Sequence, residues 1–253
     1  MKKLLTIAFI TGFAFSVQAQ NQDNPTTDAI KAAMKSEIRT EAEMERDRNR
    51  KPVETLSFLG LESDMKVVEL MPGGGWYTKL LAPVLKEKGE LIVAIGTGRV
   101  SSMIQDNDSL SDVKVGAEDS KLYRKDGARF YSLENAELGV EKADMVLTFR
   151  NYHNFAEDGR VALNDAVWDA LKMGGIYGVV DHTRRHMESE SGENRRRFDP
   201  VKAIAEIQKS GFELVDFSDL HARADDELRY EVGRKSVTGN TDRFTLKFKK
   251  VNK

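Results

Sequence analysis

The chain has 253 residues, no cysteine and a formal net charge of −2. This length suits one α/β domain of ordinary size with short extensions. The lack of cysteine excludes disulfides, thiolate nucleophiles, cysteine–zinc sites and a lipidated N-terminal cysteine. The charge balance also argues against a nucleic-acid partner, because the one dense basic cluster, at residues 195–197, is flanked by acidic residues.

The N-terminus has the composition of an export signal. Lys2 and Lys3 precede an apolar stretch at residues 4–17, and a small-residue pattern typical of a signal-peptidase site ends at Ala19. Residues 1–19 are therefore predicted to be a cleaved signal peptide, which makes the protein periplasmic or secreted, with a mature charge of about −4. No second long apolar segment follows, so no stable membrane insertion is expected after cleavage. An uncleaved N-terminal anchor is the alternative.

Residues 20–51 form a predicted N-terminal extension that is partly helical. Asp28 can cap a helix with apolar residues at helical spacing through Ala42. A second helix is expected at residues 53–59, because Gly60 suits a left-handed C-cap.

Residues 52–253 form the main predicted domain, in which strands alternate with helices. Strands are predicted at residues 66–71, 90–95, 144–149, 176–180, 212–217 and 243–249, with a short one around 129–131. Helices are predicted at residues 77–86, 99–105, 158–173 and 200–209, and a loop at 106–116. This α/β alternation predicts a parallel sheet with helices on both faces. No helix separates the last two strands, which predicts an antiparallel pair at the end of the sheet.

The most informative stretch joins the first of these strands to the helix that follows it. Glu69 stands at the strand's end, and Gly73, Gly74 and Gly75 allow the backbone to approach a ligand closely. Dinucleotide enzymes and methyltransferases share such a turn, and a purely structural turn is the alternative. Met71 stands where both classes of enzyme usually have a glycine.

The helix after the glycines opens with Trp76 and Tyr77. These rings can contact a ligand, or they can anchor the helix to the sheet.

Polar side chains follow the strand predicted at residues 144–149. Arg150, Asn151 and His153 supply hydrogen-bond donors, acceptors and a titratable base at the carboxyl edge, where α/β proteins place ligands. The alternative is a polar turn that satisfies its own backbone.

Asp181 and His182 end the next strand on the same edge, where they can orient one another or take a proton from a substrate. A helix-capping aspartate is the alternative. Asp181, His182, His153 and His186 are also residue types that bind zinc or iron. Their spacing matches no dedicated metal motif, so no metal site is predicted.

Five segments carry a resemblance to a known family: residues 48–52, 69–78, 149–154, 179–182 and 241–244. The chain resembles exported or periplasmic bacterial proteins described as predicted class I S-adenosylmethionine-dependent methyltransferases. The resemblance runs nearly end to end, from residue 47 to residue 249, and these five segments carry it. The resemblance implies a Rossmann-like class I methyltransferase sheet with an antiparallel terminal strand. It also implies S-adenosylmethionine as the cofactor.

The resemblance also assigns roles to residues. Glu69 is expected to meet the methionine part of the cofactor, and the glycines are expected to pass beneath it. The candidate cofactor-binding residues are Glu69, Pro72, Gly73, Gly74, Gly75, Trp76, Tyr77, Arg150 and Asn151. The candidate catalytic residues are His153, Asp181 and His182. The sequence departs from the family pattern after the second strand, where residues 95–98 contain no carboxylate for the ribose, and Glu118 or Asp119 is the possible replacement.

The predicted function is methyl transfer from S-adenosylmethionine to an unidentified small-molecule or protein acceptor. The alternative is an exported protein of the same fold that binds another ligand or hydrolyses a substrate with histidine and a metal. Two features favour that alternative: the missing ribose carboxylate, and an export signal to a compartment where S-adenosylmethionine is not expected to be abundant.

Overall fold

The computed structural model describes residues 24–252, so the predicted signal peptide at residues 1–19 lies outside the described residues. Its centre is a seven-stranded sheet with the strand order β3-β2-β1-β6-β7-β9-β8. The pairs β3–β2, β2–β1, β1–β6 and β6–β7 are parallel, whereas β9 runs antiparallel to both β7 and β8. The predicted antiparallel pair at the end of the sheet is therefore confirmed.

The strands of this sheet are β1 (Lys66–Leu70), β2 (Glu90–Ala94), β3 (Lys114–Val115), β6 (Ala143–Phe149), β7 (Leu171–His182), β8 (Phe212–Ser218) and β9 (Arg243–Lys250). A separate antiparallel pair consists of β4 (Lys121–Tyr123) and β5 (Ser132–Glu134). The α-helices are α1 (Pro25–Met34), α2 (Glu41–Met44), α3 (Asp47–Arg50), α4 (Pro52–Leu59), α5 (Thr78–Leu85), α6 (Gly98–Gln105), α7 (Glu157–Ala170) and α8 (Pro200–Lys209). Two 3₁₀ turns are η1 (Asp108–Leu110) and η2 (Tyr152–Asn154).

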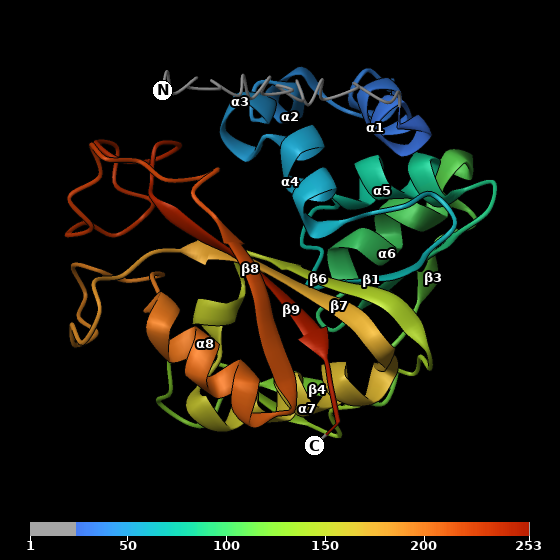
Figure 1. Cartoon of the computed structure of the whole chain (residues 1–253). Helices are drawn as coiled ribbons and strands as arrows, with labels where there is room; N and C mark the ends of the chain where they lie inside the picture. The colour runs from blue at the N-terminus through green and yellow to red at the C-terminus, as the bar shows by residue number, and fades with distance from the viewer. Residues whose placement is uncertain (1–23, 253) are drawn as a thin grey trace, which may run out of the picture.

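Helices cover both faces of the sheet, as the alternating pattern predicts (Figure 1). On one face, α1, α4, α5 and α6 bury side chains such as Leu56 and Leu80 against Val67 of β1. On the other face, α7 and α8 bury Val167 and Ile207 against the sheet. Two apolar cores therefore hold the sheet rigid and leave its carboxyl edge to carry polar side chains. Among residues 24–252, no helix is both long and apolar enough to cross a membrane.

The prediction of one helix from Asp28 through Ala42 is wrong, because this segment forms two helices. Asn24 caps α1 with its side chain, so the helix begins earlier than predicted. Thr40 then begins α2 through a reciprocal capping box with Glu43, a start signal that is visible in the sequence.

The prediction of a helix at residues 158–173 extends too far. The helix α7 ends at Ala170 and β7 begins immediately, so Gly174 and Gly175 lie inside the strand, close to an irregularity in its pairing with β6. Glycines in a strand often mark such irregularities. Val161 of α7 is exposed, so it does not face the sheet.

The short elements in the middle of the chain were predicted poorly. The loop predicted at residues 106–116 contains the edge strand β3, and the strand predicted around residues 129–131 lies later, at β5. Two- and three-residue strands are too short to show an alternating pattern. The strand predicted at residues 176–180 is longer in the structure, because β7 begins five residues earlier, at Leu171. The remaining predicted elements, including α4 with its left-handed cap at Gly60 (φ 85°), match the structure to within one or two residues.

Candidate functional site

Three strands end at the carboxyl edge of the sheet with a residue in the left-handed backbone region. Met71 follows β1 (φ 48°), Ile95 follows β2 (φ 60°) and Arg150 follows β6 (φ 62°). This conformation is costly for bulky side chains, and such residues concentrate at functional sites. The backbone at Met71 thus adopts the conformation for which related loops use glycine, and Asn151 holds it by donating its side-chain N–H to the Met71 carbonyl at 3.0 Å.

The glycine loop forms one wall of a cavity of about 320 Å³, within the size range of small-molecule sites. The cavity contains every predicted cofactor-binding residue except Gly75. Its lining residues are Glu43, Arg50, Glu69, Leu70, Met71, Pro72, Gly73, Gly74, Trp76, Tyr77, Arg99, Phe149, Arg150 and Asn151. We call it the glycine-loop cavity.

Glu69 is the buried acid of this cavity. Its Oε2 accepts a hydrogen bond of 2.6 Å from the hydroxyl of Thr78, the first residue of α5. Burial raises the pKa of Glu69 to about 7, although the Thr78 hydroxyl and the positive charge of Arg50 both favour the ionised form. The carboxylate therefore changes its charge near neutral pH.

Trp76 and Tyr77 both line the cavity and anchor the structure around it. The Tyr77 ring stacks on Phe149 with centroids 3.5 Å apart, which joins the start of α5 to the end of β6. The Trp76 indole donates to the backbone carbonyl of Glu43 at 2.9 Å, and the guanidinium of Arg50 lies 4.2 Å from its ring. The anchoring of this aromatic pair is therefore confirmed, and contact with a ligand stays a prediction.

The three glycines are not equivalent. Gly75 has a φ of 78°, and a Cβ added there would lie 2.5 Å from the Met103 Cε, whereas a Cβ at Gly74 would meet no heavy atom within 4 Å. Gly75→Ala is expected to lower the free energy of unfolding by about 1–3 kcal/mol. Gly74→Ala, the matched control, should change it by less than about 0.5 kcal/mol. Urea denaturation of the two variants checks this prediction, and equal stabilities would contradict it.

A second cavity, of about 430 Å³, adjoins the first and shares Arg99, Arg150 and Asn151 with it. Its further lining residues are Arg46, His153, Asn154, His182, Arg196, Val232, Gly233, Thr238, Gly239, Thr241 and Arg243. We call it the histidine cavity. The two predicted clusters, cofactor-binding and catalytic, therefore lie in neighbouring cavities.

Asp181 holds His153 in one orientation. Its side chain is 0% exposed and accepts the backbone N–H of His153 at 2.9 Å and that of His182 at 2.7 Å. It also lies 2.7 Å from the His153 Nδ1. An ionised carboxylate can only accept, so the Nδ1 carries the proton and the Nε2 is left as the basic nitrogen.

His182 has a different environment, although its ring centroid lies only 6.0 Å from that of His153. Its Nδ1 lies 2.9 Å from the Thr241 hydroxyl. The pKa of His182 is held well below its usual range, mainly by burial and secondly by the positive charge of Arg243. His182 is therefore a neutral imidazole at pH 7.

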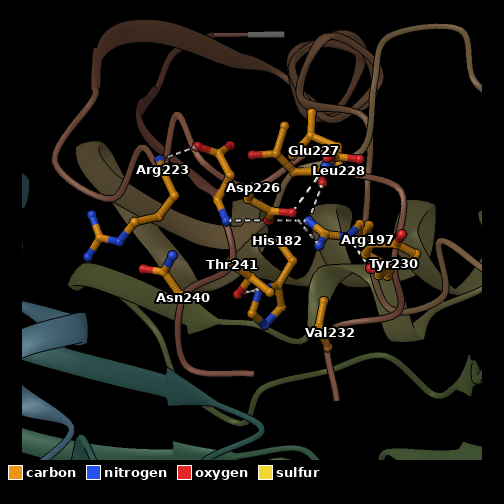
Figure 2. A network of polar contacts seen from close by, with 12 residues as sticks. His182, Arg197, Arg223, Asp226, Glu227, Leu228, Tyr230, Val232, Asn240 and Thr241 are labelled. Atoms are coloured by element: carbon orange, nitrogen blue, oxygen red, sulfur yellow. Dashed lines mark hydrogen bonds and ion pairs between the residues drawn. The ribbon is translucent and has the colours of Figure 1, made fainter. Parts of the chain in front are cut away.

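Two long connections, residues 183–199 and residues 219–242, lie beside each other on one side of the sheet (Figure 1). Figure 2 shows the buried contact that joins them: the Arg197 guanidinium donates to both Asp226 oxygens at 2.8 and 3.0 Å. Asp226 also accepts the backbone N–H groups of Leu228 and Asp242. This network fixes the second connection, which supplies the wall of the histidine cavity from Val232 to Thr241.

The predicted N-terminal extension contributes to both cavities, which the sequence analysis missed. Glu43 and Arg50 line the glycine-loop cavity, and Arg46 lines the histidine cavity. The signal for Arg50 was present, since residues 48–52 carry part of the family resemblance.

Three further candidates from the sequence do not join the site. Glu118 and Asp119 are exposed and line neither cavity, so they do not replace the missing ribose carboxylate. His186 is also half exposed, and its Nδ1 lies 2.9 Å from Asp199. In the described part of the chain, no three His, Asp or Glu side chains gather into a group that could hold a metal ion.

Comparison with solved structures identifies the architecture. A SAM-dependent methyltransferase from Aquifex aeolicus aligns with 89% of this chain and 98% of its own, at a TM-score of 0.57 and 12% identity. The fold is that of class I methyltransferases. The glycopeptide N-methyltransferase MtfA, in complex with (S)-adenosyl-L-methionine, aligns with 81% of this chain and 94% of its own, at a TM-score of 0.53 and 13% identity.

The methyltransferase fold does not by itself define the reaction. The [4+2]-cyclase SpnF aligns with 90% of this chain and 94% of its own, at a TM-score of 0.54 and 11% identity. No protein-family model and no curated protein matches the sequence. The activity therefore has to be argued from the cavities themselves.

Proposed function

We propose that the protein transfers a methyl group from S-adenosylmethionine to an acceptor that binds beside His153. One observation carries this proposal: the glycine-loop cavity and the histidine cavity adjoin one another and share Arg150, so a donor in one can face a nucleophile in the other. Holding two reactants next to each other in the right orientation can lower the barrier of such a displacement by about 7–11 kcal/mol.

The residues of the glycine-loop cavity fit the donor. Its amino-acid end carries an ammonium and a carboxylate, for which the cavity offers the acid Glu69 and the guanidinium of Arg50. The Arg50 side chain lines the cavity, and its Nε is buried without a hydrogen-bond partner in the described structure. Gly74 leaves free space where any larger residue would place its side chain.

When bound, S-adenosylmethionine supplies an electrophilic methyl carbon, which an acceptor lone pair attacks while the sulfur keeps the electrons of the broken bond. The chain's own residues position the acceptor and exclude water. His153 takes the acceptor's proton at its Nε2, and Asp181 acts as a positioning residue by holding the Nδ1 proton. His182 stays neutral beside His153 and can accept a hydrogen bond from the methyl acceptor or donate one to it.

The raised pKa of Glu69 makes donor binding depend on pH. An ammonium group binds the ionised carboxylate, and below pH about 7 this carboxylate is protonated in the free protein. Affinity for S-adenosylmethionine is therefore expected to fall about tenfold per pH unit below pH 7 and to level off above it. Calorimetry from pH 5 to pH 8 measures this dependence.

Glu69→Gln is the matched control, because glutamine keeps the shape and the Thr78 contact without the titration. The variant should bind weakly with little pH dependence in this range. A wild-type affinity that is constant from pH 5 to pH 8 would contradict the proposed role of Glu69.

We also propose that the protein is exported and that residues 1–19 are removed. The positive start, the apolar stretch and the small residues before Gln20 support this proposal. Mass spectrometry of the protein from its native source should find an N-terminus near Gln20, and an intact Met1 would contradict cleavage.

A further inference from the structure

The histidine cavity has an unusual charge. Five arginines line it, and among its described lining residues there is no Asp or Glu. They come from separate parts of the chain and are Arg46, Arg99, Arg150, Arg196 and Arg243. The fold has therefore gathered positive charge here from the N-terminal extension, α6, the sheet edge at the ends of β6 and β9, and the connection at residues 183–199.

Most of this charge is not neutralised by the protein. Arg196 pairs with Glu231, but the other four arginines form no ion pair with any carboxylate of residues 24–252. Arg243 is only 5% exposed, and the one hydrogen bond of its side chain within residues 24–252 is to the Asn49 carbonyl at 2.9 Å. Buried charge without a partner is expensive, and proteins normally pair it.

The same arginines also leave buried donors unused. The Nε atoms of Arg46, Arg150 and Arg243 are buried and have no hydrogen-bond partner in the described structure. The pKa of Arg243 is lowered to about 10, mainly by burial and secondly by the positive charge of Arg150. Burial also lowers the pKa of Arg150. An anion in the cavity would relieve the mutual repulsion of these positive charges.

We propose that the histidine cavity binds the methyl acceptor, and that this acceptor is a small molecule carrying at least two carboxylate or phosphate groups. That this ligand is the methyl acceptor rests on the proposed methyl transfer, whereas its anionic class rests on the arginines alone. The planar guanidinium matches carboxylate and phosphate oxygens with paired hydrogen bonds, which makes arginine the preferred residue for these groups.

The size and surroundings of the cavity favour a small molecule. Its volume of about 430 Å³ lies within the range of metabolite sites. A shallower hollow of about 320 Å³ adjoins it through His153, Asn154 and Arg196 and adds Arg124, Arg129 and Arg195. A positive approach of this kind draws anions toward a site. The anionic groups can thus be held by arginines while another group of the same molecule faces His153.

Calorimetry with three probes tests the proposal: citrate for carboxylates, pyrophosphate for phosphates and glucose as a neutral control. Citrate or pyrophosphate should bind one-to-one with a Kd below about 1 mM, and glucose should not bind. The tighter of the two anions identifies the charged group. Arg150→Gln and Arg99→Gln should each weaken binding at least about tenfold, the loss of one charged hydrogen-bonded contact.

Arg99 is exposed, so its variant tests the site even if Arg150→Gln does not fold. Arg229→Gln is the matched control, because Arg229 lies on the same connection as Thr241 but lines neither cavity. Failure of both anions to bind, or unchanged binding in Arg99→Gln, would overturn the proposal.

The same samples are titrated with S-adenosylmethionine, which separates the two proposals. Anion binding without donor binding would remove methyl transfer and keep the anion site. Donor binding without anion binding would remove this inference alone.

Discussion

Asp181→Asn is expected to lower the rate of methyl transfer by about 10²–10⁴-fold, the usual contribution of a general base, while S-adenosylmethionine still binds. The reason lies in one hydrogen bond of 2.7 Å between Asp181 and the His153 Nδ1. An asparagine that presents its N–H₂ group to the Nδ1 loses the hydrogen bond from the His182 backbone N–H, and the Nδ1 then becomes the acceptor, which moves the proton to the Nε2. The nitrogen that has to take the acceptor's proton is then already protonated.

Two measurements test this result. The rate is followed with methyl-labelled S-adenosylmethionine and the small-molecule fraction of the native source as acceptor. Nitrogen NMR of labelled histidine reports directly which ring nitrogen of His153 carries the proton, and it needs no acceptor. It should show the Nδ1 protonated in the wild type and the Nε2 in Asp181→Asn.

His153→Gln and the double variant provide the control. If Asp181 acts through His153, the double variant should be no less active than the less active of the two single variants, since both changes disable the same base. Additive losses, or an unchanged tautomer in Asp181→Asn, would show that Asp181 has only a structural role.

Asp226→Ala is expected to lower the free energy of unfolding by about 3–5 kcal/mol, the cost of leaving one member of a buried ion pair without its partner. Arg197 and Asp226 are 0% and 1% exposed, and their two hydrogen bonds join the two long connections (Figure 2). Without Asp226, the Arg197 guanidinium keeps only backbone carbonyls as partners.

The nearby pair of Arg229 and Glu227 gives the control, because its side chains are 62% and 64% exposed. Glu227→Ala should cost less than about 1 kcal/mol, as exposed pairs do. The double variant Arg197→Met/Asp226→Leu should recover the part of the loss that comes from the unpaired Arg197 charge, but not the part that comes from the backbone N–H groups of Leu228 and Asp242. Urea denaturation measures all three, and a loss below about 1 kcal/mol in Asp226→Ala would contradict the assigned role of the pair.

The sequence predicted the fold through its long periodic segments. The continuous apolar run of β6 and the amphipathic helix α5 are visible in a single sequence because local periodicity is set by the face that each element buries. The two-residue strand β3 and the end of α7 were missed, because their limits depend on pairing with neighbouring strands and not on local pattern.

The site was predictable only in part, for a similar reason. Glu69, His153 and Asp181 follow strands, so their place at one sheet edge follows from topology. Arg46 and Arg243 lie nearly two hundred residues apart in the sequence, and nothing local shows that they share a cavity. Their place in one cavity becomes visible only when the N-terminal extension and β9 are placed in three dimensions.

Binding of S-adenosylmethionine tests the central claim most directly. Wild-type protein is titrated at pH 8, where Glu69 is ionised, with Glu69→Gln and Gly74→Ala measured alongside. We expect one saturable site in the wild type and weaker binding in both variants, since Glu69→Gln loses the charge that faces the ammonium and Gly74→Ala fills the space beside the glycine loop. Absence of binding to the wild type at millimolar S-adenosylmethionine would contradict the account.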